Sequence, residues 1–264
     1  MVNTKKDKLD GIDLIRAILS NLHDSLKWLW LIIMGFSLVN AIEVYAKLLC
    51  PRNVENSFDL VNMFLAEPSI VFISFILVFI RFYFGDSRFL DLSYKETQYS
   101  RGLKAELDKY NGRKRTLDIM LLLNHGIFFY FMSFYIGDSA YYSYFFVILM
   151  IVNVFWLLLQ VIAGINAKYP EQDPLIGNMK GNQVLLKWSI NNLLFVVIIS
   201  YVIFSELPHR IRICIMLTIL NSLVDFRLTW KYYFPPLRDL YERDGSREGN
   251  AAFTGDGNKN KGRN

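Results

Sequence analysis

The stretch from Tyr141 to Ile165 reads YYSYFFVILMIVNVFWLLLQVIAGI and contains no charged residue over 25 positions. A transmembrane helix needs about 20 consecutive apolar residues, whereas a transmembrane strand needs only about 10, with alternating polarity. The stretch therefore predicts a helix that crosses a membrane.

Five further apolar runs of similar length lie on either side of this one. They are Trp28 to Leu49, Pro68 to Phe84, Leu117 to Ile136, Val184 to Phe204 and Ile211 to Phe234. Because 53% of the residues are hydrophobic and mean hydropathy is positive, the composition excludes a disordered chain and a nucleic-acid-binding domain. The expected fold class is an all-α integral membrane protein, a six-transmembrane-helix bundle.

The basic residues predict the orientation of this bundle. The segments on one side of the expected membrane are 1–27, 86–116, 166–183 and 235–264. They carry 21 Lys and Arg residues, whereas the opposite segments carry only Arg52 and Arg210. Since basic loops stay in the cytoplasm, we expect both termini to be cytoplasmic in a multi-pass protein of the inner or plasma membrane.

The chain divides into three parts on this interpretation. Residues 1–27 form a cytoplasmic N-terminal segment, 28–234 the six-helix membrane domain, and 235–264 a disordered cytoplasmic tail. Within residues 9–26, apolar side chains recur at helical spacing. This amphipathic pattern predicts either an interfacial helix on the inner leaflet or a cytoplasmic extension of the first span.

The cytoplasmic loop 86–116 is the one sizeable polar segment between two spans. Arg113, Lys114 and Arg115 lie in it directly before the third span. Such a cluster binds anionic lipid headgroups or serves only as a topology signal. The loop is also the expected contact for a cytoplasmic protein partner.

Two copies of one short pattern predict helix ends. Phe82 to Ser87 and Phe134 to Ser139 match at five of six positions, and each contains Gly-Asp-Ser. Glycine favours the C-terminus of a helix, and Asp or Ser favours the N-cap of the next one. We therefore expect Gly85 and Gly137 to end their helices.

The sequence contains no recognisable catalytic motif. The three His and two Cys residues, Cys50 and Cys214, are spread over different segments, and no nucleophile elbow or phosphate-binding loop is present. We therefore expect no metal, no cofactor and no enzymatic activity. Cys50 and Cys214 both fall near the outer face, where they either pair or remain free thiols.

Polar residues inside the spans are the candidate functional residues, since charge in hydrocarbon is costly. They form either an ion or solute path or a buried polar network, and they are Asp225, Lys187, Asn191, Asn221, Arg227, Arg81, Asp118, His125 and Glu43. Counted from the turn between the last two spans, Asp225 and Asn191 lie at one level and Lys187 lies one turn away. We expect Asp225 to pair with Lys187 or with a neighbour in the bundle.

Position along the spans separates the remaining charged residues. Arg81 and Asp118 lie within about one turn of the cytoplasmic face, where their side chains can reach the interface. Arg227 points away from Asp225 and needs another partner, such as Asp118 or a lipid phosphate. Glu43 is the exception, because it lies near the outer end of the first span.

These features favour an oligomeric channel-like protein or membrane-perturbing effector, a homo-oligomer with a polar vestibule facing the cytoplasm. One alternative is a small secondary transporter. The other is a membrane anchor or sensor subunit that binds a soluble partner through loop 86–116.

Overall fold

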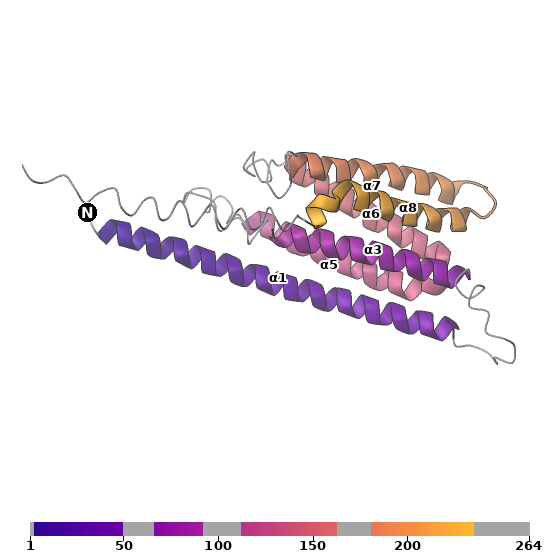
Figure 1. The fold of residues 1–264 in the computed structure, drawn as a ribbon, viewed down its shortest axis with the longest axis horizontal. Coiled ribbons are helices and arrows are strands. Elements are labelled where there is room, and N and C mark those ends of the chain that lie inside the picture. Colours follow the sequence, from indigo (N-terminus) through magenta and orange to yellow (C-terminus); the bar gives the residue numbers. More distant parts are fainter. Residues whose placement is uncertain (1–2, 50–65, 92–111, 163–180, 235–264) are drawn as a thin grey trace, which may run out of the picture.

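The computed structural model describes residues 3–49, 66–91, 112–162 and 181–234. Six long helices occupy them: α1 (Asn3–Leu49), α3 (Glu67–Leu90), α5 (Gly112–Phe134), α6 (Ser139–Ile162), α7 (Gly181–Phe204) and α8 (Arg210–Tyr233). The short 3-10 helix η3 (Tyr135–Gly137) joins α5 to α6. The long helices run side by side along the length of the molecule (Figure 1).

Five of the described helices contain segments long and apolar enough to cross a membrane. These segments are Ser20–Leu49, Glu67–Leu90, Thr116–Gly137, Ser139–Leu159 and Leu186–Phe204. The predicted class, a helical membrane protein, is therefore confirmed. α8 forms where a sixth span was predicted, but it is not among these five segments.

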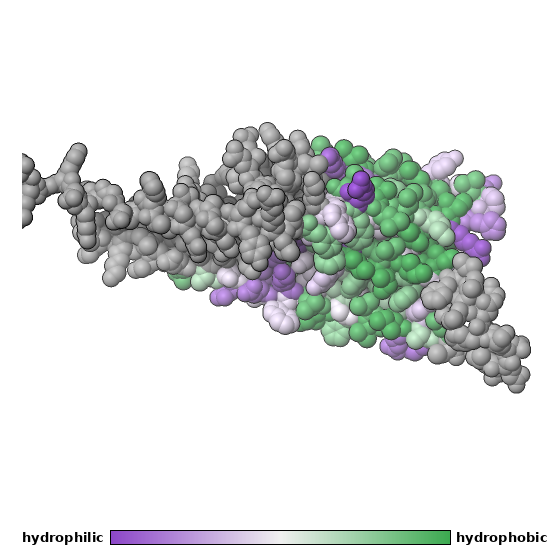
Figure 2. Space-filling view, in the orientation of Figure 1, coloured by the Kyte–Doolittle hydropathy of each residue, from purple (hydrophilic) through white to green (hydrophobic). Residues whose placement is uncertain are grey.

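The surface of the bundle is suited to lipid. Large apolar side chains are exposed on every long helix, such as Phe36 on α1, Phe155 on α6 and Tyr201 on α7. Figure 2 shows them as a continuous hydrophobic area along the helices, with hydrophilic residues gathered toward the ends. Apolar patches this extensive on a monomer mark contact with a membrane or with another protein.

The helices pack in an order that differs from their order in the chain. α6 packs against α7, and α7 packs against α8, as expected for helices that follow one another in the chain. α3, however, packs against α8 as well as against α1. Together with the packing of α5 against α6, this contact joins α1, α3 and α5 to α6, α7 and α8.

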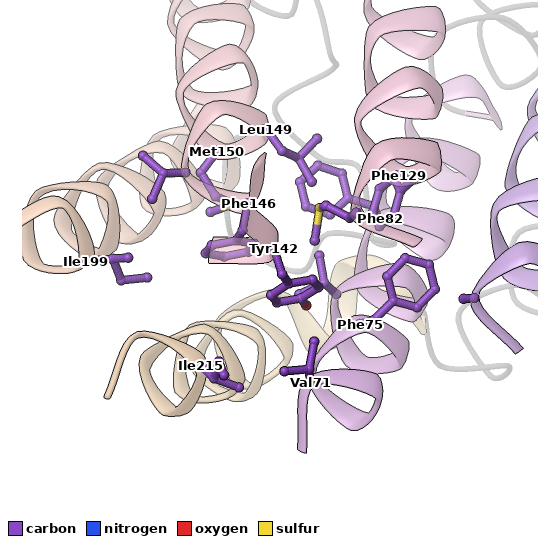
Figure 3. Packing of buried hydrophobic residues seen from close by; sticks show 14 of the residues in the cluster. Val71, Phe75, Phe82, Phe129, Tyr142, Phe146, Leu149, Met150, Ile199 and Ile215 are labelled. Atoms are coloured by element: carbon purple, nitrogen blue, oxygen red, sulfur yellow. The ribbon is translucent and has the colours of Figure 1, made fainter. Parts of the chain in front are cut away.

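Aromatic side chains from α3, α5 and α6 fill the core. Phe75 and Phe82 of α3 meet Phe129 of α5 edge to face, with ring centroids 6.1 and 5.4 Å apart. Tyr142 of α6 lies beside them and donates a hydrogen bond to Ser74 (Figure 3). Edge-to-face contacts of this kind stabilise beyond simple burial.

The first helix is a single continuous element. α1 runs from Asn3 to Leu49 without a break, so residues 9–26 extend the first span. Of the two arrangements predicted for residues 9–26, the structure therefore agrees with a continuous extension of the first span rather than a separate interfacial helix. In Figure 1 the N-terminal part of α1 projects beyond the other helices.

The two Gly-Asp-Ser copies have different structures. Gly137 ends η3, and the Asp138 carboxylate accepts hydrogen bonds from the first amides of α6, as predicted. The prediction for Gly85 was wrong, because α3 continues through it to Leu90. A side chain at position 85 would collide with the Trp188 ring of α7, so this glycine permits close helix packing instead.

Candidate functional site

Arg81 lies deep inside the bundle. It is nine residues from the end of α3 at Leu90, or about 14 Å along the helix axis. Its side chain has no exposed surface. The prediction that Arg81 reaches the interface was therefore wrong, because Gly85 does not end the helix and α3 is longer than the apolar run suggested.

Asp225 of α8 is the ionic partner of Arg81. The Arg81 Nε and the Asp225 Oδ2 are 2.9 Å apart, and neither side chain is exposed. Lys187, the predicted partner, lies on the exposed side of α7. A buried charge pair forms only where geometry is good, since each charge alone is costly to remove from water.

Three asparagines complete the surroundings of this ion pair. The Arg81 guanidinium donates one hydrogen bond to Asn221 of α8 and another to Asn192 of α7. Asn192 in turn donates to Asn153 of α6, at 2.8 Å. Side chains from α3, α6, α7 and α8 therefore form one hydrogen-bonded network around Arg81.

Two further groups of α8 bind Asp225. The Tyr233 hydroxyl donates to the Asp225 Oδ2 at 2.6 Å, and the Thr229 hydroxyl donates to the Asp225 backbone carbonyl at 2.7 Å. The ion pair and its hydrogen-bonding partners are called the Arg81 cluster below. Its members are Arg81, Asn153, Asn192, Asn221, Asp225, Thr229 and Tyr233.

Four members of the Arg81 cluster lie at a similar depth, whereas Thr229 and Tyr233 lie nearer to the end of α8. The basic end of the bundle is defined here as the end where α3, α6 and α8 finish and α7 begins. Counted from the helix termini, Arg81, Asn153, Asn192 and Asp225 lie about 12–17 Å from this end, in helices about 36 Å long. The cluster is therefore near the middle of the bundle.

Several polar atoms of the cluster lack a hydrogen-bond partner within the described residues. They are the Oδ1 of Asp225, the side-chain nitrogens of Asn153 and Asn221, and the Arg81 Nε, which contacts Asp225 as an ion pair without a hydrogen bond. An unsatisfied buried polar group costs about 1–3 kcal/mol. Buried donor and acceptor atoms without a partner could form hydrogen bonds with a small polar ion or solute.

The other predicted residues lie elsewhere. Asn191 is buried beside the cluster, but its side-chain nitrogen has no partner in the described part, and Asn192 makes the contacts instead. Arg227 is exposed on α8. Asp118 is fully buried, so the prediction that it reaches the interface was also wrong. Glu43 is exposed and forms an ion pair with Lys47 at 2.6 Å.

Some predictions fall outside the described residues. Arg113, Lys114 and Arg115 belong to the first turn of α5, and their side chains are outside the described residues. Cys50, most of loop 86–116 and the tail 235–264 also lie outside them. Cys214 is buried as a free thiol.

His125 of α5 forms a second buried pair. Its Nδ1 is 2.9 Å from the Oδ2 of Asp86, and both side chains are buried. Asp86 belongs to the Gly-Asp-Ser copy that was predicted to cap a helix, so its role differs from the prediction. The pair joins α3 to α5 one level nearer to the basic end than Arg81.

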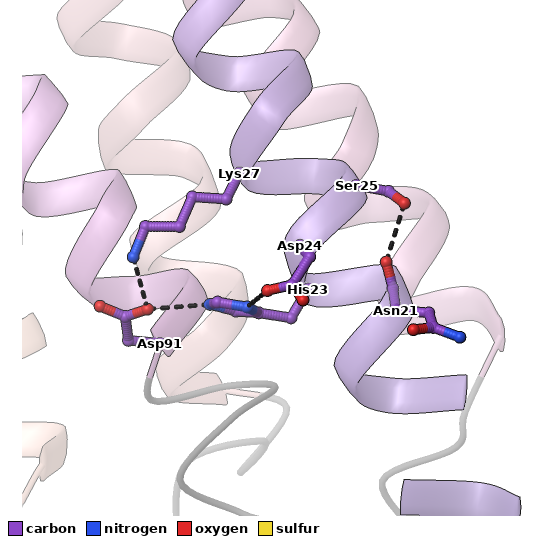
Figure 4. A network of polar contacts seen from close by, with 6 residues as sticks. All are labelled: Asn21, His23, Asp24, Ser25, Lys27 and Asp91. Carbon is purple, nitrogen blue, oxygen red and sulfur yellow. Dashed lines mark hydrogen bonds and ion pairs between the residues drawn. The ribbon is translucent and has the colours of Figure 1, made fainter. Parts of the chain in front are cut away.

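A third polar group lies at the basic end itself, between α1 and α3. The Asp91 Oδ1 is 2.8 Å from the His23 Nε2 and 2.8 Å from the Lys27 Nζ. The other ring nitrogen of His23 is 2.9 Å from Asp24 (Figure 4). These contacts connect the end of α3 to the point where α1 leaves the bundle.

Asp91 gives this connection a pH dependence. Burial of its carboxyl raises the pKa, but the hydrogen bonds and charges of Lys27 and His23 lower the pKa by more, to below the ordinary value of 3.8. The stabilisation is therefore fully present above pH 3.8 and is lost as the pH falls through the lower folded-state value. We expect the free energy of unfolding to fall on acidification by about 1 kcal/mol more in the wild type than in Asp91→Asn.

Thermal unfolding in detergent, followed from about pH 6 down to about pH 2, measures this difference. Glu43→Gln is the control, because Glu43 is an exposed carboxylate on α1 with a lysine partner. An acid-induced loss that is equal in Asp91→Asn and the wild type would contradict the assignment.

Sequence reasoning missed several of these residues. Asn153 carried a signal, since it is the one amide in the otherwise apolar run from Phe145 to Leu159. Tyr233 carried none, because an aromatic residue near a helix end is typical of the membrane interface. Within the described residues, no group of three His, Cys, Asp or Glu is arranged to hold a metal ion.

Comparison of the chain with protein-family models, curated proteins and solved structures gives no match.

Proposed function

We propose that the protein is a non-enzymatic, multi-pass membrane protein that moves a small ion or solute across the bilayer through the Arg81 cluster of each protomer. The observation that carries this proposal is the Arg81–Asp225 ion pair, fully buried near mid-depth. Charged residues at such depth are rare in membrane proteins and mark ion or solute pathways.

The position of the Arg81 cluster favours a transporter over an oligomeric pore. A pore on a symmetry axis is lined by residues at the interface between protomers. The Arg81 cluster instead lies between α3, α6, α7 and α8 of one chain. Transporter sites also lie near the bilayer midplane, between two groups of helices.

The burial of the cluster also bears on mechanism. With no exposed surface on Arg81 or Asp225, the cluster is closed in this structure, in contrast to the open vestibule expected from the sequence. A closed site with spare polar atoms fits a carrier that opens to one side at a time. In such a carrier, the Arg81–Asp225 ion pair must weaken when the transported ion or solute binds.

The proposal takes α8 as a sixth span. α8 has 24 residues, as α3 and α7 do, and its polar residues Thr218, Asn221, Ser222, Asp225 and Thr229 are all buried. Because Asp225 and these polar side chains are directed inward, they need not contact lipid if α8 spans the membrane. Six spans and the basic-residue asymmetry put both termini in the cytoplasm.

A flux measurement tests the proposed function. The protein is reconstituted into sealed vesicles of phosphatidylethanolamine and phosphatidylglycerol loaded with potassium chloride and a small anionic dye. We expect wild-type vesicles to release one of these species faster than protein-free vesicles. Asp225→Asn should change the rate at least about tenfold, which corresponds to about 1.4 kcal/mol of barrier.

Arg227→Gln is the matched control, since Arg227 lies on the same helix two residues away and is exposed. It should leave the rate unchanged. Vesicles as tight as protein-free ones, with folded protein present, would contradict the proposal. Equal rates for Asp225→Asn and the wild type would contradict the role of the cluster.

A further inference from the structure

We propose that the His125–Asp86 pair is a proton-binding site, reached from the basic end through a cavity between α1 and α3. The inference rests on the proposed function and names the proton as an ion that the protein binds. It concerns a pair of residues outside the Arg81 cluster.

The first argument is charge balance. Asp86 contacts no Lys or Arg within the described residues, and its ionic partner is His125. By contrast, Asp225 has Arg81 and Asp91 has Lys27. With a neutral imidazole, the pair would carry one net negative charge in a buried site, which is costly. The pair is neutral only when it holds one additional proton.

The second argument is a free ring nitrogen. The His125 Nδ1 faces Asp86, and the fully buried Nε2 has no hydrogen-bond partner among the described residues. If Nδ1–H donates to the carboxylate, Nε2 carries the lone pair that accepts a proton. A hydronium ion donates the added proton: its O–H bond breaks to leave water as the N–H bond forms at Nε2, and the charge of the pair changes from −1 to 0.

The surroundings of His125 favour binding of a proton over binding of a metal ion. The Phe82 ring meets the imidazole edge to face at 4.9 Å, and the Trp30 ring lies at 6.4 Å. These rings leave His125 with aromatic neighbours and no additional carboxylate. A metal ion requires three or more donors, whereas a proton requires only one.

A cavity of about 240 Å³ between α1 and α3 comes close to the pair, although neither His125 nor Asp86 lines it. Asp24, Lys27 and Ser87 line its polar part, and Tyr83 and Trp30 line its aromatic part. Trp30 therefore borders both the cavity and the imidazole. Water that enters this cavity from the basic end is separated from the imidazole only by the Trp30 ring.

Other charged and titratable groups surround the pair on the packed helices. Toward the basic end of the packed helices, the described ones include His23, Asp24 and Lys27 on α1, Arg81, Tyr83, Arg88 and Asp91 on α3, Asp118 on α5, and Asp225, Arg227 and Tyr233 on α8. Arg81, Asp86 and Asp91 follow one another at five-residue intervals, or about 7.5 Å along α3. The pair is thus the middle one of three acid-containing sites between the basic end and mid-depth.

Nitrogen NMR of histidine-labelled protein tests proton binding without requiring transport. The chain contains only three histidines, His23, His125 and His209, so each signal can be assigned with one variant. Spectra are recorded from about pH 9 to about pH 5, and we expect the ring nitrogens of wild-type His125 to report proton uptake as the pH is lowered, and Asp86→Asn to change that response. Exposed His209 is the internal control, and its transition should be the same in both proteins.

Two NMR results would overturn the inference. One is a His125 ring that remains neutral over the whole range. The other is a His125 transition that is the same in Asp86→Asn and the wild type. The wild-type titration needs no variant, so it decides the question even where a substitution prevents folding.

A transport measurement separates this inference from the proposed function. Vesicles containing a pH-sensitive dye are given a potassium diffusion potential, and internal acidification is recorded. We expect wild-type protein to admit protons and His125→Gln to reduce the rate by at least about a hundredfold, as for loss of a positioned proton carrier. His209→Gln should retain the wild-type rate.

The outcomes are distinguishable. Flux of potassium, chloride or dye that is the same in His125→Gln and the wild type, without proton uptake, would overturn the proton inference and leave the proposed function intact. A proton-binding His125 in vesicles that move nothing would overturn the proposed function and leave the binding site intact.

Discussion

Arg81→Met is expected to lower the free energy of unfolding by about 3–5 kcal/mol, because it leaves the buried Asp225 carboxylate without its cation. The substitution also removes the donors to Asn192 and Asn221. Titration of the detergent-solubilised protein with a denaturing detergent, followed by circular dichroism, measures the loss. Arg227→Met is the control, since Arg227 is exposed on α8, and it should change stability by less than about 0.5 kcal/mol.

A double substitution separates structure from function. In Arg81→Met with Asp225→Leu, both charges are replaced by apolar groups, and buried ion pairs replaced in this way often leave stability unchanged or increased. We expect the double variant to recover most of the stability lost in Arg81→Met but to remain inactive in the flux assay. Loss of stability in Arg81→Met no greater than in Arg227→Met would contradict the ion pair.

Gly126→Leu is expected to destabilise the protein by about 1–3 kcal/mol through overpacking. Gly126 lies on α5 where that helix meets α1, and a β-carbon there would overlap the side chain of Ile33. The nearest atom is the Ile33 Cγ2, which is attached directly to the β-carbon and so moves little without the backbone of α1. We therefore expect α1 to separate from α5. The same denaturant titration measures the effect.

Gly35 offers a control with the opposite expected sign. It lies on α1, two residues from Ile33, and no atom lies within 4 Å of a β-carbon at this position. Since glycine in a helix interior is unfavourable by about 0.8–1 kcal/mol, Gly35→Leu should leave stability unchanged or increase it. Equal destabilisation by the two substitutions would contradict the close approach of α1 and α5.

The apolar runs were sufficient to predict the helices, because length and hydropathy alone determine whether a segment can cross a bilayer. They did not give the true end of α3. The sequence around Gly85 is typical of a helix end, but in the structure α3 continues through Gly85, which packs closely against Trp188. The local pattern contains no information about a ring on another helix.

The polar site was predicted only in part. Asp225, Asn221 and Arg81 were recognised as unusual residues inside spans, and the structure brings all three together. The partnership between Arg81 and Asp225 was not predicted, because it depends on α3 packing against α8. One sequence orders helices along the chain but does not say which distant helices become neighbours. For the same reason Asn192 was passed over in favour of Asn191.

The contact between α3 and α8 has a consequence for synthesis. Asn221, which binds Arg81, is 140 residues further along the chain. At a translation rate of about 5–20 residues per second, α3 waits on the order of 10 s in the membrane before α8 emerges. An arginine near the centre of a span costs about 2.5–3.5 kcal/mol during insertion, so the apolar remainder of α3 must offset that cost alone. Nascent chains halted before α8 therefore contain Arg81 without its ionic partner Asp225.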